Sequence, residues 1–134
     1  MKKLIVLVLI SFVSFYQLVA QNTEDKQRLY WGYYHSDIDN DYLSKKSVMR
    51  WVKANLPLKV ITTVNAEEIK VYKIELIVSE IKRTVKTYSA ESDTLSEEMK
   101  KAFENLNSGD AVTLKAYFKV KEKTETLQLE FAIE

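Results

Sequence analysis

Few residues of this chain have side chains suited to catalysis. The chain contains no cysteine, and its single histidine is His35. A serine–histidine–acid triad would need His35 as its base, yet no serine stands in the glycine-flanked turn that exposes such a nucleophile. The two glycines, Gly32 and Gly109, are too few to build a glycine-rich phosphate loop. The sequence therefore predicts that the protein is not an enzyme and has no catalytic residues.

A short acidic segment is arranged like the first half of an EF-hand calcium loop, with Asp37, Asp39 and Asp41 at alternate positions. Such a loop needs glycine at its sixth position and glutamate at its twelfth, where this chain has Tyr42 and Val48. One histidine also cannot form a multi-histidine metal centre. We predict a solvated loop here, without a bound metal or cofactor. An irregular calcium site is the alternative.

The aromatic segment from Tyr30 to His35 has two interpretations. Aromatic side chains are frequent at binding hot spots, but they also favour strands and bury large areas in cores. Core or edge packing is the favoured interpretation, and the alternative hypothesis is an exposed edge strand to which a partner adds a strand. The predicted partner surface comprises Trp31, Tyr33, Tyr34, Asp37, Asp39 and Asp41.

The N-terminus has the three parts of a secretory signal peptide. Lys2 and Lys3 precede an apolar run that begins at Leu4, and the run ends at the small residue Ala20 before a polar stretch. We predict cleavage after Ala20, giving a signal peptide at 1–20 and a mature domain at 21–134. An uncleaved membrane anchor is the alternative, and the absence of cysteine excludes a lipoprotein anchor.

The mature chain is almost neutral. The full chain has 20 basic and 19 acidic residues, and loss of Lys2 and Lys3 leaves 18 basic residues and a net charge of −1. Nucleic-acid binding depends on clustered positive charge, so this balance argues against a nucleic-acid partner. The 114 residues that remain suit one domain able to bury about two thirds of its unfolded surface. Because the domain has no disulfides, its stability depends on its hydrophobic core.

Two segments have the apolar periodicity of helices. In residues 44–55, apolar residues recur at spacings of three and four, Ser44 can cap the start, and Pro57 prevents continuation. In residues 95–107, a similar stripe follows Thr94, which has Glu97 at the capping-box spacing, and Gly109 is expected to end the helix. The predicted stripe of this second helix comprises Leu95, Met99, Ala102, Phe103 and Leu106.

The remaining segments predict strands. Residues 58–64 and 69–79 read as strands, residues 84–88 as a hairpin partner, and residues 112–120 and 127–133 alternate apolar with polar residues. Phe118 and Phe131 fall on the apolar faces of the last two strands, so we expect them to pack inward against the second helix. In residues 69–79 the expected inward face comprises Tyr72, Ile74, Leu76 and Val78. The predicted fold is a β-rich, single-domain α+β fold with an antiparallel sheet or sandwich and two helices.

The second half of the chain contains a longer motif. Ser92-Asp93-Thr94-Leu95-Ser96 precedes the second helix, Leu106-Asn107-Ser108-Gly109 follows it, and Ala111-Val112-Thr113-Leu114 begins the next strand. With these elements, residues 72–133 resemble the C-terminal domain of GldM, the periplasmic shaft protein of gliding motility and type IX secretion. The resemblance implies that residues 72–133 share the fold of that domain and that the protein is located in the cell envelope. The shaft-building role is not carried over.

Asp93-Thr94-Leu95 also resembles the short O-glycosylation acceptor of exported proteins in bacteria that carry the GldM family. Thr94 is therefore a candidate modification site as well as a candidate helix cap.

These patterns together predict a periplasmic or secreted protein that binds another envelope or secreted protein and contacts a membrane only through an uncleaved signal. The alternatives are a small-ligand or glycan-binding module and an inhibitor or immunity-type protein.

Overall fold

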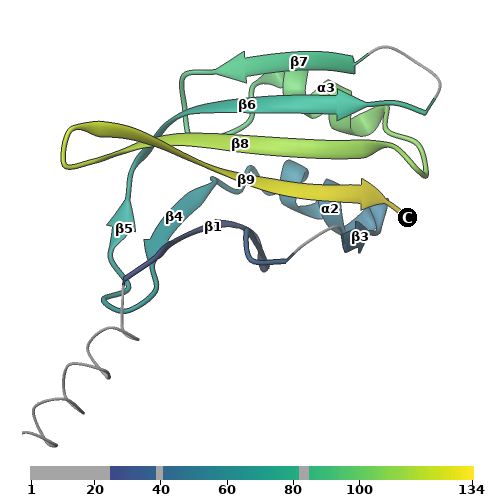
Figure 1. Cartoon of the computed structure of the whole chain (residues 1–134). Coiled ribbons are helices and arrows are strands. Elements are labelled where there is room, and N and C mark those ends of the chain that lie inside the picture. The colour runs from purple at the N-terminus through teal and green to yellow at the C-terminus, as the bar shows by residue number, and fades with distance from the viewer. Residues whose placement is uncertain (1–24, 39–40, 82–84) are drawn as a thin grey trace, which may run out of the picture.

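The computed structural model describes residues 25–38, 41–81 and 85–134. Together they form one β-rich α+β domain with two sheets and two helices, which confirms the predicted fold class (Figure 1). The predicted signal peptide at 1–20 and the candidate residue Asp39 lie outside the described residues. Neither described helix has the length and apolar character needed to cross a membrane.

A four-stranded antiparallel sheet has the order β2-β1-β4-β5. Its strands are β1 (Gln27–Trp31), β2 (Tyr34–His35), β4 (Lys59–Thr62) and β5 (Glu68–Ile69). A five-stranded sheet has the order β3-β9-β8-β6-β7. Its strands are β3 (Asp41–Leu43), β6 (Val71–Ser79), β7 (Val85–Ala90), β8 (Ala111–Val120) and β9 (Lys123–Ile133).

The hairpin of β8 and β9 forms where strict alternation predicted two strands. Its inward positions are buried except for Val120 and Leu127, which are partly buried, and this confirms the predicted faces, including those of Phe118 and Phe131. Lys121 and Glu122 connect the strands with backbone φ angles of 50° and 67°. Two consecutive residues with positive φ match the tight turn whose twist suits a hairpin, so the ladder runs without interruption from Val120–Lys123 to Ala111–Ala132.

The prediction that Tyr72 faces inward is wrong. The register between β6 and β8 shifts between Val71 and Lys73, and this irregularity leaves Val71 buried and Tyr72 exposed. A bulge inserts one extra residue and so reverses the alternation on one side of it. Ile74, Leu76 and Val78 keep their predicted inward position.

The first helix, α2 (Lys45–Lys53), forms as predicted. The side-chain oxygen of Ser44 accepts a hydrogen bond from the backbone N–H of Ser47 at 3.2 Å and caps the start. Val48, Trp51 and Val52 are buried on one face of the helix, which is the face that the three- and four-residue spacing predicted.

The second helix, α3 (Glu97–Glu104), starts later than the predicted cap. Ser96 is the N-cap, and its hydroxyl accepts from the backbone N–H of Met99 at 3.2 Å. The capping role of Thr94 is therefore wrong, because Thr94 lies in the preceding turn. Gly109 has a φ of 92° but lies beyond Asn105, the C-cap of the helix, and its N–H donates to the C=O of Ile133 at 2.8 Å. It therefore positions the start of β8 rather than the helix end.

The short strand β3 makes the five-stranded sheet mixed. It pairs with β9 in parallel, with Asp41 beside Phe131 and Leu43 beside Ile133. The sequence analysis assigned Asp41 to an acidic loop, because a three-residue strand that pairs with the distant end of the chain leaves no pattern in the local sequence. The prediction of an antiparallel sheet is therefore wrong at this edge, where β3 and β9 are parallel.

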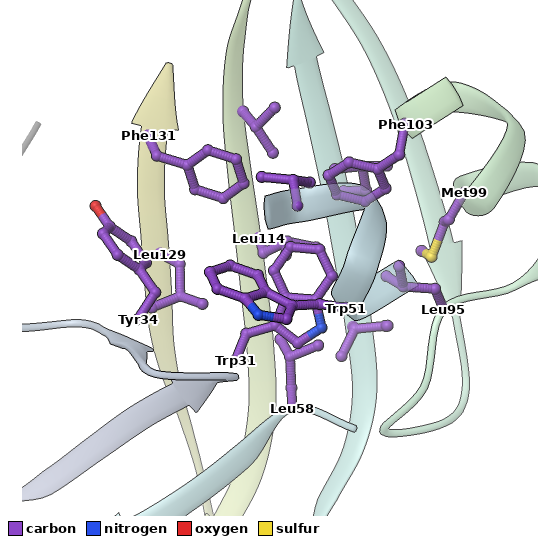
Figure 2. Packing of buried hydrophobic residues seen from close by; sticks show 14 of the residues in the cluster. Trp31, Tyr34, Trp51, Leu58, Leu95, Met99, Phe103, Leu114, Leu129 and Phe131 are labelled. Atoms are coloured by element: carbon purple, nitrogen blue, oxygen red, sulfur yellow. The ribbon is translucent and has the colours of Figure 1, made fainter. Parts of the chain in front are cut away.

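One continuous apolar cluster joins both sheets and both helices, and its buried members lie between Leu29 and Ile133. Figure 2 shows Trp31 within this cluster, with Trp51 beside it and Phe103 approaching from α3. This core contains Trp31 and Tyr34 of the aromatic segment, whereas Tyr33 is exposed.

Candidate functional site

The structure divides the predicted aromatic surface between the core and the solvent. Trp31 and Tyr34 are fully buried, with exposed fractions of 0%, whereas Tyr33 is 67% exposed. The indole of Trp31 lies 5.2 Å from the ring of Trp51 and 5.3 Å from that of Phe103, measured between centroids. The surface assignment of Trp31 and Tyr34 is therefore wrong, because the alternation of the hairpin turns both rings toward the helices and β9.

The edge-strand hypothesis is wrong for Tyr30 and Trp31, because β1, the strand that contains them, is paired with both β2 and β4. Tyr34 does lie in an edge strand, β2, but this strand has only two residues. Gly32, at a φ of 60°, begins the tight connection to β2. The hydroxyl of Tyr34 donates to the C=O of Glu130 at 2.6 Å, which ties β2 to β9 and leaves the ring packed against Phe131 (Figure 2).

The acidic residues of the predicted rim belong to different elements. Asp37 lies in the turn after β2 and forms an ion pair with Arg28. The guanidinium of Arg28 donates hydrogen bonds to Tyr30 and to Asp37. Both bonds, that to Tyr30 more strongly, raise the pKa of the guanidinium above its ordinary value. Asp41 begins β3, where its Oδ1 accepts from the backbone N–H of Tyr42 at 2.9 Å. Across residues 25–38, 41–81 and 85–134, no three histidine or acidic side chains are grouped to hold a metal ion.

His35 has a local structural contact. Its Nδ1 accepts from the backbone N–H of Asp37 at 3.3 Å, and its ring lies 5.5 Å from that of Tyr30. Both contacts stabilise the turn after β2.

Thr94 lies in the turn before α3 and is half-buried. Its Oγ1 is 3.0 Å from the hydroxyl oxygen of Ser92, and its backbone N–H donates to the same oxygen at 3.1 Å. The preceding Asp93 carbonyl accepts from the N–H of Leu58 at 2.8 Å. The candidate glycosylation residue is thus held in an ordered turn beside the four-stranded sheet.

A hollow that the sequence analysis missed lies on the outer face of the five-stranded sheet, and we call it the Tyr42 hollow. Tyr42 is 67% exposed and adjoins Ala132 of β9, which in turn pairs with Ala111 of β8. A large ring beside two alanines creates a depression of about 370 Å³. Its lining residues are Asp41, Tyr42, Ala111, Val112, Thr113, Glu130, Phe131 and Ala132.

Both charged residues that line the Tyr42 hollow, Asp41 and Glu130, are acidic. Asp41 was a predicted rim residue, but its aromatic neighbour is Tyr42 rather than the Tyr30–Tyr34 segment. The three-residue pairing of β3 with β9 brings these groups together from opposite ends of the chain. In the sequence, only the adjacent residues Asp41 and Tyr42 indicate this hollow.

Elsewhere on the same outer face, Tyr117 of β8 is surrounded by charged groups. Its hydroxyl donates a hydrogen bond to Glu75 of β6, and this bond raises the pKa of the phenol above its ordinary value. The ammonium groups of Lys73 and Lys115 lie 5.0 Å and 5.4 Å from the ring centroid. These contacts link β6 and β8 on the outer face.

A second hollow, of about 560 Å³, lies where the bulge turns Tyr72 outward. Lys70, Lys119, Ile69 and Thr124 line it with Tyr72. The ammonium of Lys119 lies 5.9 Å from the Tyr72 ring centroid, and the hydroxyls of Tyr72 and Thr124 are 3.4 Å apart. This hollow combines an aromatic ring with positive charge.

No protein-family model, curated protein or solved structure matches this chain. The resemblance of residues 72–133 to the C-terminal domain of GldM remains a prediction from the sequence.

Proposed function

We propose that this protein is an exported, non-catalytic component of the cell envelope that binds another protein through the Tyr42 hollow. The observation that carries this proposal is the 67% exposure of Tyr42 beside a floor of two alanines. Exposed tyrosines next to small depressions favour protein contact, because a rigid amphipathic ring buries much area at little entropic cost.

The charge of the hollow indicates the chemistry of the partner. Asp41 and Glu130 lie on its lining without a basic residue among them. A lysine or arginine side chain of the partner can lay its alkyl stem along the Tyr42 ring and place its charged group near these carboxylates. The partner segment is therefore expected to be basic and to insert a long side chain.

The export half of the proposal rests on the sequence. The Lys2-Lys3 pair and the apolar run from Leu4 to Ala20 favour translocation and cleavage. Mass spectrometry of the protein from fractionated native cells tests this, with Gln21 expected as the first residue. Recovery of the mature protein with residues 4–16 still attached would contradict it.

The contact surface is tested by photo-crosslinking in native cells, with the reactive amino acid placed at position 42 or at position 33. Tyr33 is a matched control, because it is also 67% exposed. The same partner should be captured from position 42 and not from position 33. With the captured protein purified, Tyr42→Ser should weaken binding about tenfold, equivalent to about 1.4 kcal/mol, and Tyr33→Ser should leave it unchanged.

The acidic lining gives a second readout. Glu130→Gln should lower the association rate and reduce its dependence on salt, because a charge at the rim acts mainly by attracting the partner. Equal capture from both tyrosine positions, or binding that Tyr42→Ser does not alter, would place the contact elsewhere.

A second candidate function is the binding of an acidic sugar, which the hollow beside Tyr72 favours. Its aromatic ring and its two lysines, Lys70 and Lys119, match the apolar face and the carboxylate of such a ligand. Calorimetric titration with a uronic-acid oligosaccharide and with its neutral counterpart tests this. Binding of the acidic form alone, with loss of binding in Lys119→Gln, would support this function. The absence of binding heat with either sugar would rule it out.

A further inference from the structure

The edges of the two sheets differ in how well they are protected from pairing with another chain. Three of the four edge strands are short, because β2 and β5 have two residues each and β3 has three. The part of β9 that extends beyond β3 carries the charged residues Lys123 and Glu125. Short edge strands and edge charges are common devices against unwanted strand pairing.

The fourth edge strand, β7, is longer than these three and less well protected. It is six residues long, contains no proline, and has the sequence Val-Lys-Thr-Tyr-Ser-Ala with a single charged side chain, Lys86. Its hydrogen-bonded neighbour among the described residues is β6 alone. Alternate residues of β7 therefore direct their backbone N–H and C=O groups toward solvent. Val85 adds an apolar side chain that is 60% exposed.

We propose that β7 pairs with β7 of a second copy of this chain, so that two five-stranded sheets join into one continuous sheet. A two-fold axis perpendicular to the sheet makes the two strands antiparallel and keeps the outer face of each copy on the same side. Directly opposed residues must then share a face, which restricts the register to pairs whose residue numbers add to an even total.

The register centred on Tyr88 best fits the side chains. It sets Tyr88 opposite Tyr88 of the second copy, Lys86 opposite Ala90, and Thr87 opposite Ser89. A register centred on Thr87 would instead place the two Lys86 side chains diagonally across from each other, where like charges repel. The strand is thus self-complementary because its one charge lies away from the centre.

The surface at β7 is separate from the Tyr42 hollow. β7 and β3 are the opposite edges of the five-stranded sheet, with three strands between them (Figure 1). Self-association through β7 therefore leaves Tyr42 accessible, and a result that contradicts one proposal does not affect the other.

Charge substitutions at Thr87 and Ser89 provide a test that spares the core. Both side chains are exposed, and within one copy they lie opposite Ile77 and Glu75. In the variant T87K/S89K, each lysine faces a lysine of the second copy. In the matched variant T87E/S89K, each lysine faces a glutamate. The two variants differ at position 87 alone.

The measurement is sedimentation equilibrium of the chain from Gln21 onward, from about 1 μM to about 1 mM, the range expected of a small interface. That chain contains all of the described residues. We expect a reversible dimer whose dissociation constant rises at least about tenfold in T87K/S89K and returns to the parent range in T87E/S89K at low salt. Circular dichroism checks that each variant is folded.

Tyr42→Ser should dimerise like the parent and serves as the control for an unrelated surface substitution. A parent chain that stays monomeric across the whole range overturns the proposal. A dimer that both charge variants leave unchanged, or that both weaken equally, shows that another surface or register mediates the contact.

Discussion

Replacing Trp31 by alanine distinguishes a core residue from a binding residue most directly. Trp31 has an exposed fraction of 0% and contacts the rings of Trp51, Phe103 and Phe131 at 5.2, 5.3 and 6.4 Å between centroids. Its Nε1–H also donates to the C=O of Leu56 at 3.3 Å. The side chain thus links β1 to both helices and to β9.

The expected magnitude follows from this burial. A tryptophan buries up to about 250 Å², and at about 25 cal/mol per Å² this gives an upper limit of about 6 kcal/mol. Substitutions of this kind usually cost about 3 to 5 kcal/mol. Because a domain of this size is stable by about 5 to 15 kcal/mol, Trp31→Ala should leave the fold marginal. Trp31→Phe keeps most of the apolar contact and should cost about 1 to 3 kcal/mol.

The assay is urea unfolding followed by far-ultraviolet circular dichroism, since removing a tryptophan alters the fluorescence signal itself. Tyr33→Ala is the control, because Tyr33 is two residues away and 67% exposed, and it should cost about 1 kcal/mol or less. Comparable m-values would show that the variants lose stability rather than two-state behaviour. A Trp31→Ala protein that unfolds within about 1 kcal/mol of the parent would refute the core assignment and restore the surface interpretation.

Three other perturbations test particular contacts. Gly32→Ala should cost about 2 to 4 kcal/mol in chemical unfolding, because φ is +60° and the new Cβ would lie 2.7 Å from Cε2 of Trp51. Asp110→Ala should cost about 1 to 3 kcal/mol, since this buried carboxylate accepts from two backbone N–H groups in the turns that follow α3 and β6; a smaller loss would show that water replaces those bonds. The pKa of Tyr117 is raised from the ordinary 10.0 by its bond to Glu75, so the folded state holds this proton more tightly, and the associated stability is present below pH 10 and declines at higher pH. The difference between the ultraviolet titrations of the parent and of Tyr117→Phe should show a tyrosine that ionises above pH 10, and a difference centred at or below pH 10 would contradict the bond.

Local patterns determined much of this fold. The alternation in residues 112–120 and 127–133 predicted two strands and their inward faces, because a strand repeats every two residues whatever it packs against. The three- and four-residue spacing, with Ser44 and Pro57, determined α2 for the equivalent reason in a helix. These features depend on neighbours in sequence and need no knowledge of distant contacts.

Where two local solutions compete, the sequence was less reliable. Thr94 and Ser96 are both able to cap a helix, and the structure selects Ser96 because its hydroxyl reaches the N–H of Met99. At Tyr72 the alternation predicts an inward ring, but a single bulge against β8 turns the ring outward. Such shifts of one or two residues depend on the register of the partner strand, which the local sequence does not specify.

The candidate surfaces were decided by tertiary structure alone. The composition of the segment from Trp31 to Tyr34 suits a hot spot and a core equally well, and only α2, α3 and β9 closing over Trp31 and Tyr34 distinguish the two. The Tyr42 hollow requires Asp41 and Tyr42 to pair with residues about 90 positions away. Sequence periodicity reports which side of an element is apolar, whereas burial depends on which distant element covers that side.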